Sequence, residues 1–200
     1  MKRFFLLAVG LSAVFGTASC SHDFSQKWEA QKAELTPAQI SKIAAPKKHI
    51  KTSCIVEINC PDEITSEYKS DNFSYPLAQI LENVYNGARD VFLEPPQYGT
   101  NSFKLLIDVQ EASLSVKTNI FDNGGTAVFT INLICRLYDP TEKRIYGTNI
   151  VVEKESPIDQ TLYDYVFDAV YDGCKDSAVS IFKSILSDSR TVNSFNRFEK

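Results

Sequence analysis

Several stretches of the chain alternate between apolar and polar side chains, which is the pattern of a β-strand with one buried face. In residues 54–60, CIVEINC, every even-numbered side chain is apolar, and Pro61 ends the run. In residues 129–137 the odd-numbered side chains are apolar, with Ile131 and Leu133 at the centre. Residues 144–155, RIYGTNIVVEKE, predict the next strand. Each of these strands is expected to lie on a hydrophobic core.

The stretch 103–116 changes its phase part of the way along. Its apolar side chains stand first at odd and then at even positions: Phe103, Leu105, Ile107 and Val109, then Ala112, Leu114 and Val116. A shift of phase within one strand predicts a β-bulge. Asn123-Gly124 predicts a tight hairpin turn after this strand, and Asp139-Pro140 predicts a second turn. Three sequential strands joined in this way predict an antiparallel meander.

Two other stretches carry apolar residues at helical spacing. The first follows Ser74, a candidate N-cap, and Pro76, which suits a first helical turn; Pro95 ends it. Its apolar face consists of Leu77, Ile80, Leu81, Val84, Ala88, Val91 and Phe92. The second runs from about residue 159 to residue 188. Its apolar face consists of Leu162, Val166, Ala169, Val170, Cys174, Ala178, Ile181 and Ile185.

The order of elements is therefore β-α-β-β-β-α, which predicts an α+β domain. We expect a single mixed sheet of about four strands with two helices packed on one face. This domain is predicted to span residues 52–190. Residues 20–51 contain too few apolar side chains for a core of their own and predict a polar tether. Residues 191–200 show no clear period and are interpreted as a C-terminal tail.

The N-terminus has the layout of an export signal. Lys2 and Arg3 precede an apolar run from Phe4 to Phe15, and small residues lead to Cys20. The run is shorter than the roughly 20 residues that span a bilayer, so residues 1–19 are interpreted as a signal peptide. The cysteine that follows predicts a lipoprotein in which Cys20 is lipidated and anchors the chain in a membrane. The alternative is an ordinary signal peptide that is cut nearby and leaves Cys20 unmodified.

The charge of the chain limits its partners. The formal net charge is −4, and removal of Lys2 and Arg3 with the signal peptide takes it to about −6. Nucleic acid binding requires basic side chains that neutralise phosphates, and this chain has no basic run. An acidic surface is also a poor match for anionic lipid. Contact with a membrane is therefore expected through the anchor at Cys20.

Four cysteines remain in the predicted domain: Cys54, Cys60, Cys135 and Cys174. An exported protein can form disulfides. Each of these cysteines nevertheless falls on the apolar face of its segment, where a free thiol behaves as a small hydrophobic side chain. Both readings stay open from the sequence, with free core thiols preferred. A zinc site is a weaker reading because no CxxC pair is present.

The sequence lacks the patterns expected of an active site. The only histidines, His22 and His49, lie in the predicted tether, so the domain has no Ser-His or Cys-His pair. No phosphate loop, HExxH motif or EF-hand spacing occurs. Carboxylate pairs such as Asp62-Glu63 are more typical of a solvated surface. The sequence therefore predicts a protein that is not an enzyme and has no metal site or cofactor.

Four aspartates follow one another at every fourth position of the last predicted helix. They share one face and form what we call the acidic stripe: Asp164, Asp168, Asp172 and Asp176. Like charges at this spacing repel by about 0.2–0.5 kcal/mol per pair, which a packed helix can tolerate. The stripe is most simply a solvated face. Flanking aromatic residues would also suit a contact surface for a basic partner, and these are Tyr163, Phe167 and Tyr171.

The layout resembles a set of small Gram-negative envelope lipoproteins. The stretch SFKLLIDVQEASLSVKTNIFDNGGTAVFTINLICRLYDPTEKRIYGTNIVVE, followed by the helix that ends in SIFKSILSDSR, is similar in element order to YajG-like lipoproteins. It is also similar in outline to the auxiliary lipoproteins of ABC-type lipid transporters, to the lipopolysaccharide-assembly lipoprotein LptE and to lipoprotein activators of cell-wall synthases. By the sorting rule of enterobacterial lipoproteins, Ser21 implies the outer membrane, with the domain facing the periplasm.

Two functions are compatible with this resemblance. In the first, the domain is an accessory subunit that binds another envelope protein through an exposed surface or a sheet edge. In the second, the interface between helices and sheet opens to hold a lipid or another apolar ligand. A ligand-sized cavity between helices and sheet would favour the second, whereas a solid core with exposed Tyr163, Phe167 and Tyr171 would favour the first.

Overall fold

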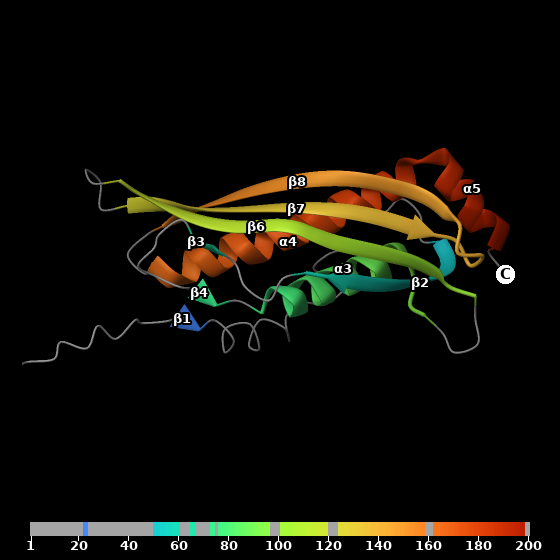
Figure 1. Ribbon diagram of the computed structural model, residues 1–200, viewed down its shortest axis with the longest axis horizontal. Coiled ribbons are helices and arrows are strands. Elements are labelled where there is room, and N and C mark those ends of the chain that lie inside the picture. The colour runs from blue at the N-terminus through green and yellow to red at the C-terminus, as the bar shows by residue number, and fades with distance from the viewer. Residues whose placement is uncertain are drawn as a thin grey trace, which may run out of the picture.

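The fold is that of a computed structural model (Figure 1), which describes residues 22–23, 50–60, 65–66, 73–74, 76–96, 101–119, 124–158 and 162–198. The predicted signal peptide, Cys20 and Asn123 of the predicted hairpin turn lie outside these residues. The short strands β1 (His22–Asp23) and β4 (Phe73–Ser74) pair in parallel as a small separate sheet.

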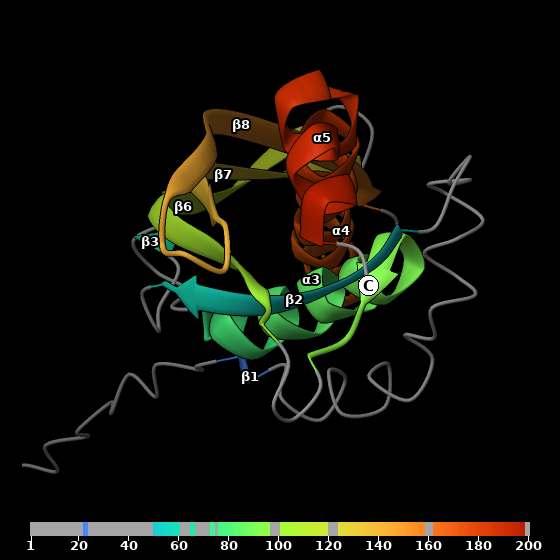
Figure 2. The same ribbon diagram turned by 90° about the vertical axis from the view of Figure 1, so that its right-hand side faces the viewer.

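The main sheet is mixed, as predicted, and it is also curled. Its strands are β2 (Ile50–Asn59), β5 (Leu93–Glu94), β6 (Phe103–Asn119), β7 (Gly124–Tyr138) and β8 (Arg144–Ile158). They lie in the order β5-β2-β6-β7-β8, and the short β3 (Thr65–Ser66) also pairs with β6. β2 runs parallel to β5 and β6, whereas β6, β7 and β8 form the predicted antiparallel meander. Figure 2 shows the curl of the sheet from β8 through β7 and β6 to β2.

Two long helices pack on one face of the sheet, which we call the inner face. α3 (Leu77–Phe92) contacts β2, and α4 (Leu162–Ser187) contacts α3, β7 and β8. The start of α3 differs by two residues from the prediction. Pro76, not Ser74, is the N-cap, and its carbonyl accepts a 3.0 Å hydrogen bond from the amide of Ile80.

The period-two pattern correctly identified the buried positions of the strands. Ile131 and Leu133 are fully buried, as are Phe103, Leu105 and Ile107. The predicted bulge is confirmed, because the β6–β7 register shifts between Val109 and Glu111. After the shift the even-numbered positions Ala112, Leu114 and Val116 become the buried ones. The bulge keeps one apolar face along a strand of 17 residues.

The tail interpretation of residues 191–200 was wrong, because a third helix, α5 (Ser189–Phe198), ends the described chain. Asp188 caps it by accepting hydrogen bonds from the amides of Arg190 (2.8 Å) and Thr191 (3.2 Å). These hydrogen bonds lower the pKa of the Asp188 carboxyl, and the bond from the Thr191 amide has the larger effect. Phe195 is fully buried and lies edge-on to Phe103 of β6, with 4.8 Å between ring centroids. The hydrophobic core therefore extends past residue 190. It also begins before residue 52, since Ile50 is buried in β2.

One glycine controls how closely α4 approaches the sheet. A Cβ atom at Gly173 would lie 2.5 Å from Cδ1 of Phe129 and 3.4 Å from Cβ of Lys154. Real Cβ atoms do not approach other heavy atoms so closely, so a larger residue would push the helix away from β7. Gly173 thus allows the backbone of α4 to lie against the ring of Phe129.

The second predicted turn is present between β7 and β8. The Asp139 carboxylate accepts hydrogen bonds from the Thr141 amide (2.9 Å), the Thr141 hydroxyl (2.6 Å) and the Lys143 amide (3.1 Å). Burial alone would raise the pKa of Asp139, but these hydrogen bonds together lower it. Glu142 has a φ of 63°, in the left-handed region. The side chain of Asp139 therefore fixes the turn in the way expected of an aspartate at its first position.

Candidate functional site

The inner face of the sheet is filled by side chains. Its largest fully buried residues are aromatic: Tyr85, Phe103, Phe129, Phe167, Phe182 and Phe195. Tyr85 of α3 and Ser177 of α4 share a 3.1 Å hydrogen bond, and the hydroxyl of Ser177 lies 2.7 Å from the Cys174 carbonyl. Phe92 and Phe182 stack with centroids 5.8 Å apart. The part of the helix–sheet interface that the structure describes is thus a packed core, in which the hydroxyls of Tyr85 and Ser177 are paired.

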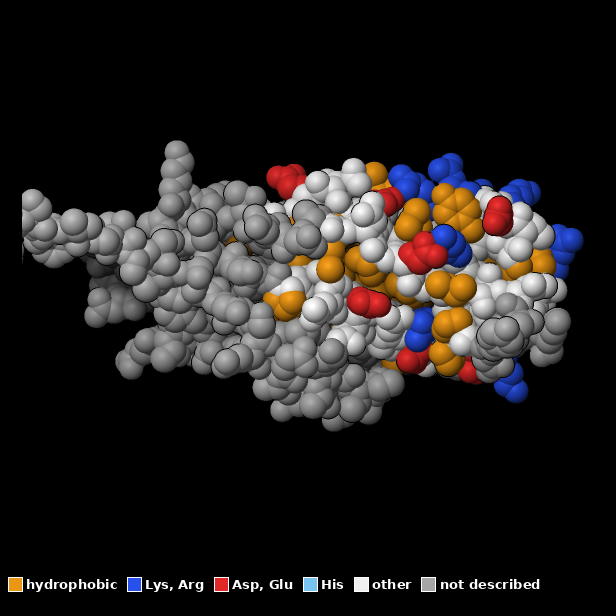
Figure 3. Space-filling model, turned by 60° about the horizontal axis from the view of Figure 1, so that its bottom comes forward, with side chains coloured by type: hydrophobic (Ala, Val, Ile, Leu, Met, Phe, Trp, Pro, Cys, Tyr) orange, Lys and Arg blue, Asp and Glu red, His pale blue; other side chains and the backbone are white. Residues whose placement is uncertain are grey.

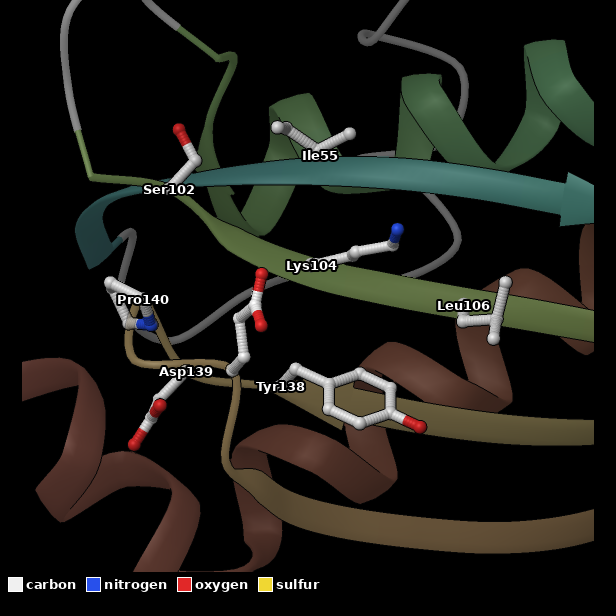
Figure 4. Close-up of a pocket in the computed structure, with 8 residues that line it drawn as sticks. Ile55, Ser102, Lys104, Leu106, Tyr138, Asp139 and Pro140 are labelled. Carbon is white, nitrogen blue, oxygen red and sulfur yellow. The ribbon is translucent and has the colours of Figure 1, made fainter.

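The other face of the sheet, which we call the outer face, carries a shallow groove of about 480 Å³. The close-up in Figure 4 looks onto this face, with α3 and α4 behind the strands. The groove crosses β2, β6, β7 and the turn after β7. It is lined by Ile55, Ser102, Lys104, Leu106, Tyr138, Asp139, Pro140 and Glu142. Its volume falls within the range of about 300–1,000 Å³ that is typical of ligand sites.

The lining of the groove combines apolar and charged groups. Register places Ile55 beside Lys104, and Lys104 beside Tyr138, so three strands contribute adjacent side chains. Lys104 pairs with Glu57 of β2, with 2.6 Å between Nζ and Oε2. Ile55 is 39% exposed, although it lies in a strand. An apolar floor with one cation and acidic groups at the rim can bind an amphipathic chain segment.

Farther along the outer face, the charges are paired with one another. Arg136 of β7 forms an ion pair with Asp108 of β6, and Asn59 of β2 donates a 3.3 Å hydrogen bond to the same carboxylate. On the face shown in Figure 3, acidic and basic side chains lie among hydrophobic ones, and the Lys and Arg side chains are most frequent toward the upper right of the described part.

The structure describes the side chains of three of the four aspartates of the acidic stripe, and it corrects one residue of the aromatic flank. Val170, Cys174 and Ala178 are buried, so the phase of α4 is right. Asp168, Asp172 and Asp176 are half-buried. Phe167, however, is fully buried and stacks on Tyr171 with centroids 6.2 Å apart, so it cannot belong to a contact surface. The side chains of Tyr163 and Asp164 lie outside the described residues.

Cations of the chain itself neutralise part of the stripe. Lys154 of β8 pairs with Asp176, with 2.9 Å between Nζ and Oδ2, and this hydrogen bond raises the pKa of Lys154. Lys175 pairs with Asp172 and also lies 5.3 Å from the ring centroid of Tyr171. The ion pair of Asp176 holds α4 against β8, and the ion pair of Asp172 neutralises a charge within α4. Both aspartates therefore have a structural role. Whether the stripe also contacts a partner stays a prediction.

The cysteines of the core lie on apolar faces. Cys54, Cys135 and Cys174 are buried free thiols, whereas Cys60 at the end of β2 is half-buried. Burial raises the pKa of Cys54 and of Cys135 to about 12, and it also raises that of Cys174. Because the thiolate is the reactive form, these three groups are suited to packing and unsuited to nucleophilic or redox chemistry.

Within the described ranges, no group of three or more His, Cys, Asp or Glu side chains could hold a metal ion. In the same part of the chain, no helix is both long and apolar enough to cross a membrane.

The sequence did not predict the groove, although it carries a signal. Ile55 and Leu106 occupy the outward positions of their strands, where an alternating pattern calls for polar residues. An apolar side chain out of phase indicates either a covered face or a contact surface. The pairing of β2 with β6, which brings the two residues to one site, could not be read from either strand alone.

Comparison with known proteins supports the fold. A Xanthomonas campestris protein of the DUF330 family is 15% identical, with a TM-score of 0.51 over 76% of this chain and 91% of that one. A minor lipoprotein from Acinetobacter baumannii is 11% identical over 71% and 94% of the two chains, with a TM-score of 0.43. Rare lipoprotein B from Shewanella oneidensis is 13% identical over 69% and 98%, with a TM-score of 0.38. No protein-family model and no curated protein sequence matches the chain. The likeness to the Xanthomonas protein therefore establishes a shared fold.

Proposed function

We propose that this protein is a small bacterial envelope lipoprotein, anchored through Cys20, that acts without catalysis as an accessory subunit of an envelope complex. The N-terminal pattern of basic, apolar and small residues before Cys20 supports the anchor. Similar solved structures that are described as lipoproteins are consistent with it. In this proposal the chain is sorted to the outer membrane and the domain faces the periplasm.

The groove on the outer face is the proposed partner site, and its position is the observation that carries the proposal. It lies on the sheet face opposite α3 and α4, and its floor combines Ile55, Leu106 and Tyr138 with Lys104. An open amphipathic groove suits an extended or irregular segment of another protein. The alternative of a lipid carrier receives less support, because fully buried aromatic side chains fill the helix–sheet interface.

The anchor is tested by replacing Cys20. The variant Cys20→Ser is expected to move from the membrane fraction to the soluble periplasmic fraction, because it cannot be acylated. Unchanged membrane fractionation of this variant would contradict the lipid anchor.

The partner site is tested by cross-linking in intact envelopes, followed by purification of the anchored protein. Lys104→Glu combined with Tyr138→Ser is expected to remove the cross-linked partner, because it changes the charge and the ring in the groove. The matched control is Asp172→Asn with Tyr171→Ser on α4, which should retain the partner. Retention by the groove variant and loss by the control would assign the contact to the acidic stripe.

A further inference from the structure

In the described part of the chain, β8 forms one end of the sheet and is paired along one side only. It is 15 residues long and hydrogen-bonds to β7. Among the described residues no strand pairs with its other side, and none of the backbone hydrogen bonds of turns and helix caps reaches it. A strand edge of this kind presents a row of unpaired N–H and C=O groups, which is a template for a further strand.

The centre of this edge lacks the usual protection. Proline is absent from Arg144 to Ser156, and the residues Ile150, Val151 and Val152 are consecutive and apolar. Val151 is 64% exposed on the outer face, which makes it the more exposed of the two large hydrophobic side chains, Val151 and Ile55, that are exposed in the described part. Natural edge strands more often carry a charge, a bulge or a proline at such a position.

α4 holds the strand in place from the inner face. The hydroxyl of Tyr146 lies 2.6 Å from that of Ser184, near the start of β8. Near its end, Lys154 pairs with Asp176. Because both ends are fixed to the same helix, the edge is already extended before any partner arrives, and little conformational entropy is lost on pairing.

The charges along β8 are self-complementary in one direction only. Lys143 and Arg144 are exposed at its beginning, and Glu153 and Glu155 are exposed toward its end. Two copies of the strand side by side in parallel would bring like charges together. In an antiparallel pair with Asn149 at the two-fold axis, Val151 of each copy lies opposite Gly147 of the other, and Lys143, just before the strand, comes level with Glu155. Arg144 comes level with Lys154, whose charge is already paired with Asp176. Gly147 has no side chain, so it leaves space for the exposed valine.

We propose that two copies of this protein associate through β8, antiparallel and edge to edge, and so form one continuous sheet across the pair. The partner at this edge is thus a second copy of the chain, as the charge pattern of β8 indicates. The pairing uses the edge of the sheet, whereas the groove opens on its outer face. The inference therefore stands independently of the proposed function.

The first test measures the mass of the full-length protein in detergent by sedimentation across a range of concentrations. The unsubstituted protein is expected to dimerise, and Val151→Lys should weaken the dimer at least tenfold. At a dilution where both proteins are monomeric, Tm should be unchanged, because the side chain is exposed in the single chain. Ile55→Lys is the matched control on a strand away from the edge, and it should dimerise normally. A monomer at every concentration, or a dimer unaffected by Val151→Lys, would overturn the proposal.

Two further experiments identify the surface and the direction of pairing. Glu155→Lys should weaken the dimer, and adding Lys143→Glu should restore it, since only an antiparallel self-pair brings these two residues level. Asn149→Cys should form a disulfide with its copy across the axis under mild oxidation, beyond the background of the unsubstituted protein. Glu57→Cys, exposed on β2, should not. Absence of both the rescue and the Asn149→Cys dimer would exclude this pairing. A monomer that still captures an envelope partner would exclude it and leave the proposed function standing.

Discussion

The same strands form both faces of the sheet, but the side chains of the two faces differ in burial. On the inner face, side chains such as Ile131 and Leu133 are fully buried beneath two helices. On the outer face, Ile134 is only half-buried, and its neighbours include the ion pair of Arg136 with Asp108. Burial of apolar side chains on the inner face therefore contributes most of the stability. The side chains of the outer face remain accessible to a partner. Substitutions placed on each face test this difference between them.

The largest contrast is expected in thiol reactivity. With their pKa raised to about 12 from 9.0, Cys54 and Cys135 have a thiolate population about a thousandfold below that of an ordinary cysteine near neutral pH. Alkylation of the native protein should therefore be slow at these positions and fast after unfolding, as followed by mass spectrometry. A cysteine placed on the outer face by Ile55→Cys should react at once. Rapid native labelling of Cys54 would show that the inner face is not closed.

A truncation on each face should separate core from surface. Ile131→Ala is expected to cost about 2–5 kcal/mol of unfolding free energy, because it leaves a cavity under α4. Ile134→Ala, in the same strand on the outer face, should cost less than half as much. Denaturant unfolding of both variants measures the difference. Equal costs would mean that the outer face is covered as tightly as the inner one.

Substitutions of two glycines compare the cost of an added methyl group in the core with its cost on the outer face. Gly173→Ala is expected to destabilise by about 1–3 kcal/mol through overpacking against Phe129, although alanine favours helices. Gly147→Ala is the control, since its Cβ would meet only the Cys135 carbonyl at an ordinary 3.7 Å. Thermal unfolding should show a lowered Tm for the first variant only. A stabilised Gly173→Ala would show that α4 can move away from the sheet.

The smallest effect is expected for the ion pair in the groove. Lys104 and Glu57 keep 45% and 46% of their side-chain surface exposed, so water screens their attraction. Lys104→Ala should change the unfolding free energy by no more than about 1 kcal/mol. If the loss is larger, Lys104 is part of the stability of the sheet, and its variants cannot be used as clean tests of recognition.

Much of the inner face could be predicted from the sequence, because burial enforces a period that local reading can detect. The change of phase at Val109 predicted the bulge, and the helical spacing of Val170, Cys174 and Ala178 predicted the buried face of α4. α5 was missed because its buried residues, Thr191 and Phe195, are only two. Asp188, with its N-cap position before Ser189, was the available signal.

The outer face could not be predicted in the same way. The groove depends on β2 running parallel to β6, a pairing between residues about 50 positions apart. Phe167 was misplaced for a related reason. The apolar face of α4 is wider than a single line of residues because it contacts both α3 and the sheet, so Phe167 and Phe182 are buried together with Val170.

The proposal that the outer face binds a partner while the inner face forms the core is tested most directly by site-specific photo-cross-linking in living cells. The photoreactive residue p-benzoylphenylalanine would replace Tyr138 in the groove, Tyr171 beside the acidic stripe, and Val151 at the edge of β8. The account predicts a product with one defined envelope protein from position 138, a product with a second copy of the chain from position 151, and neither from position 171. A partner product from position 171, with none from position 138, would contradict the claim that the outer face of the sheet is the recognition surface.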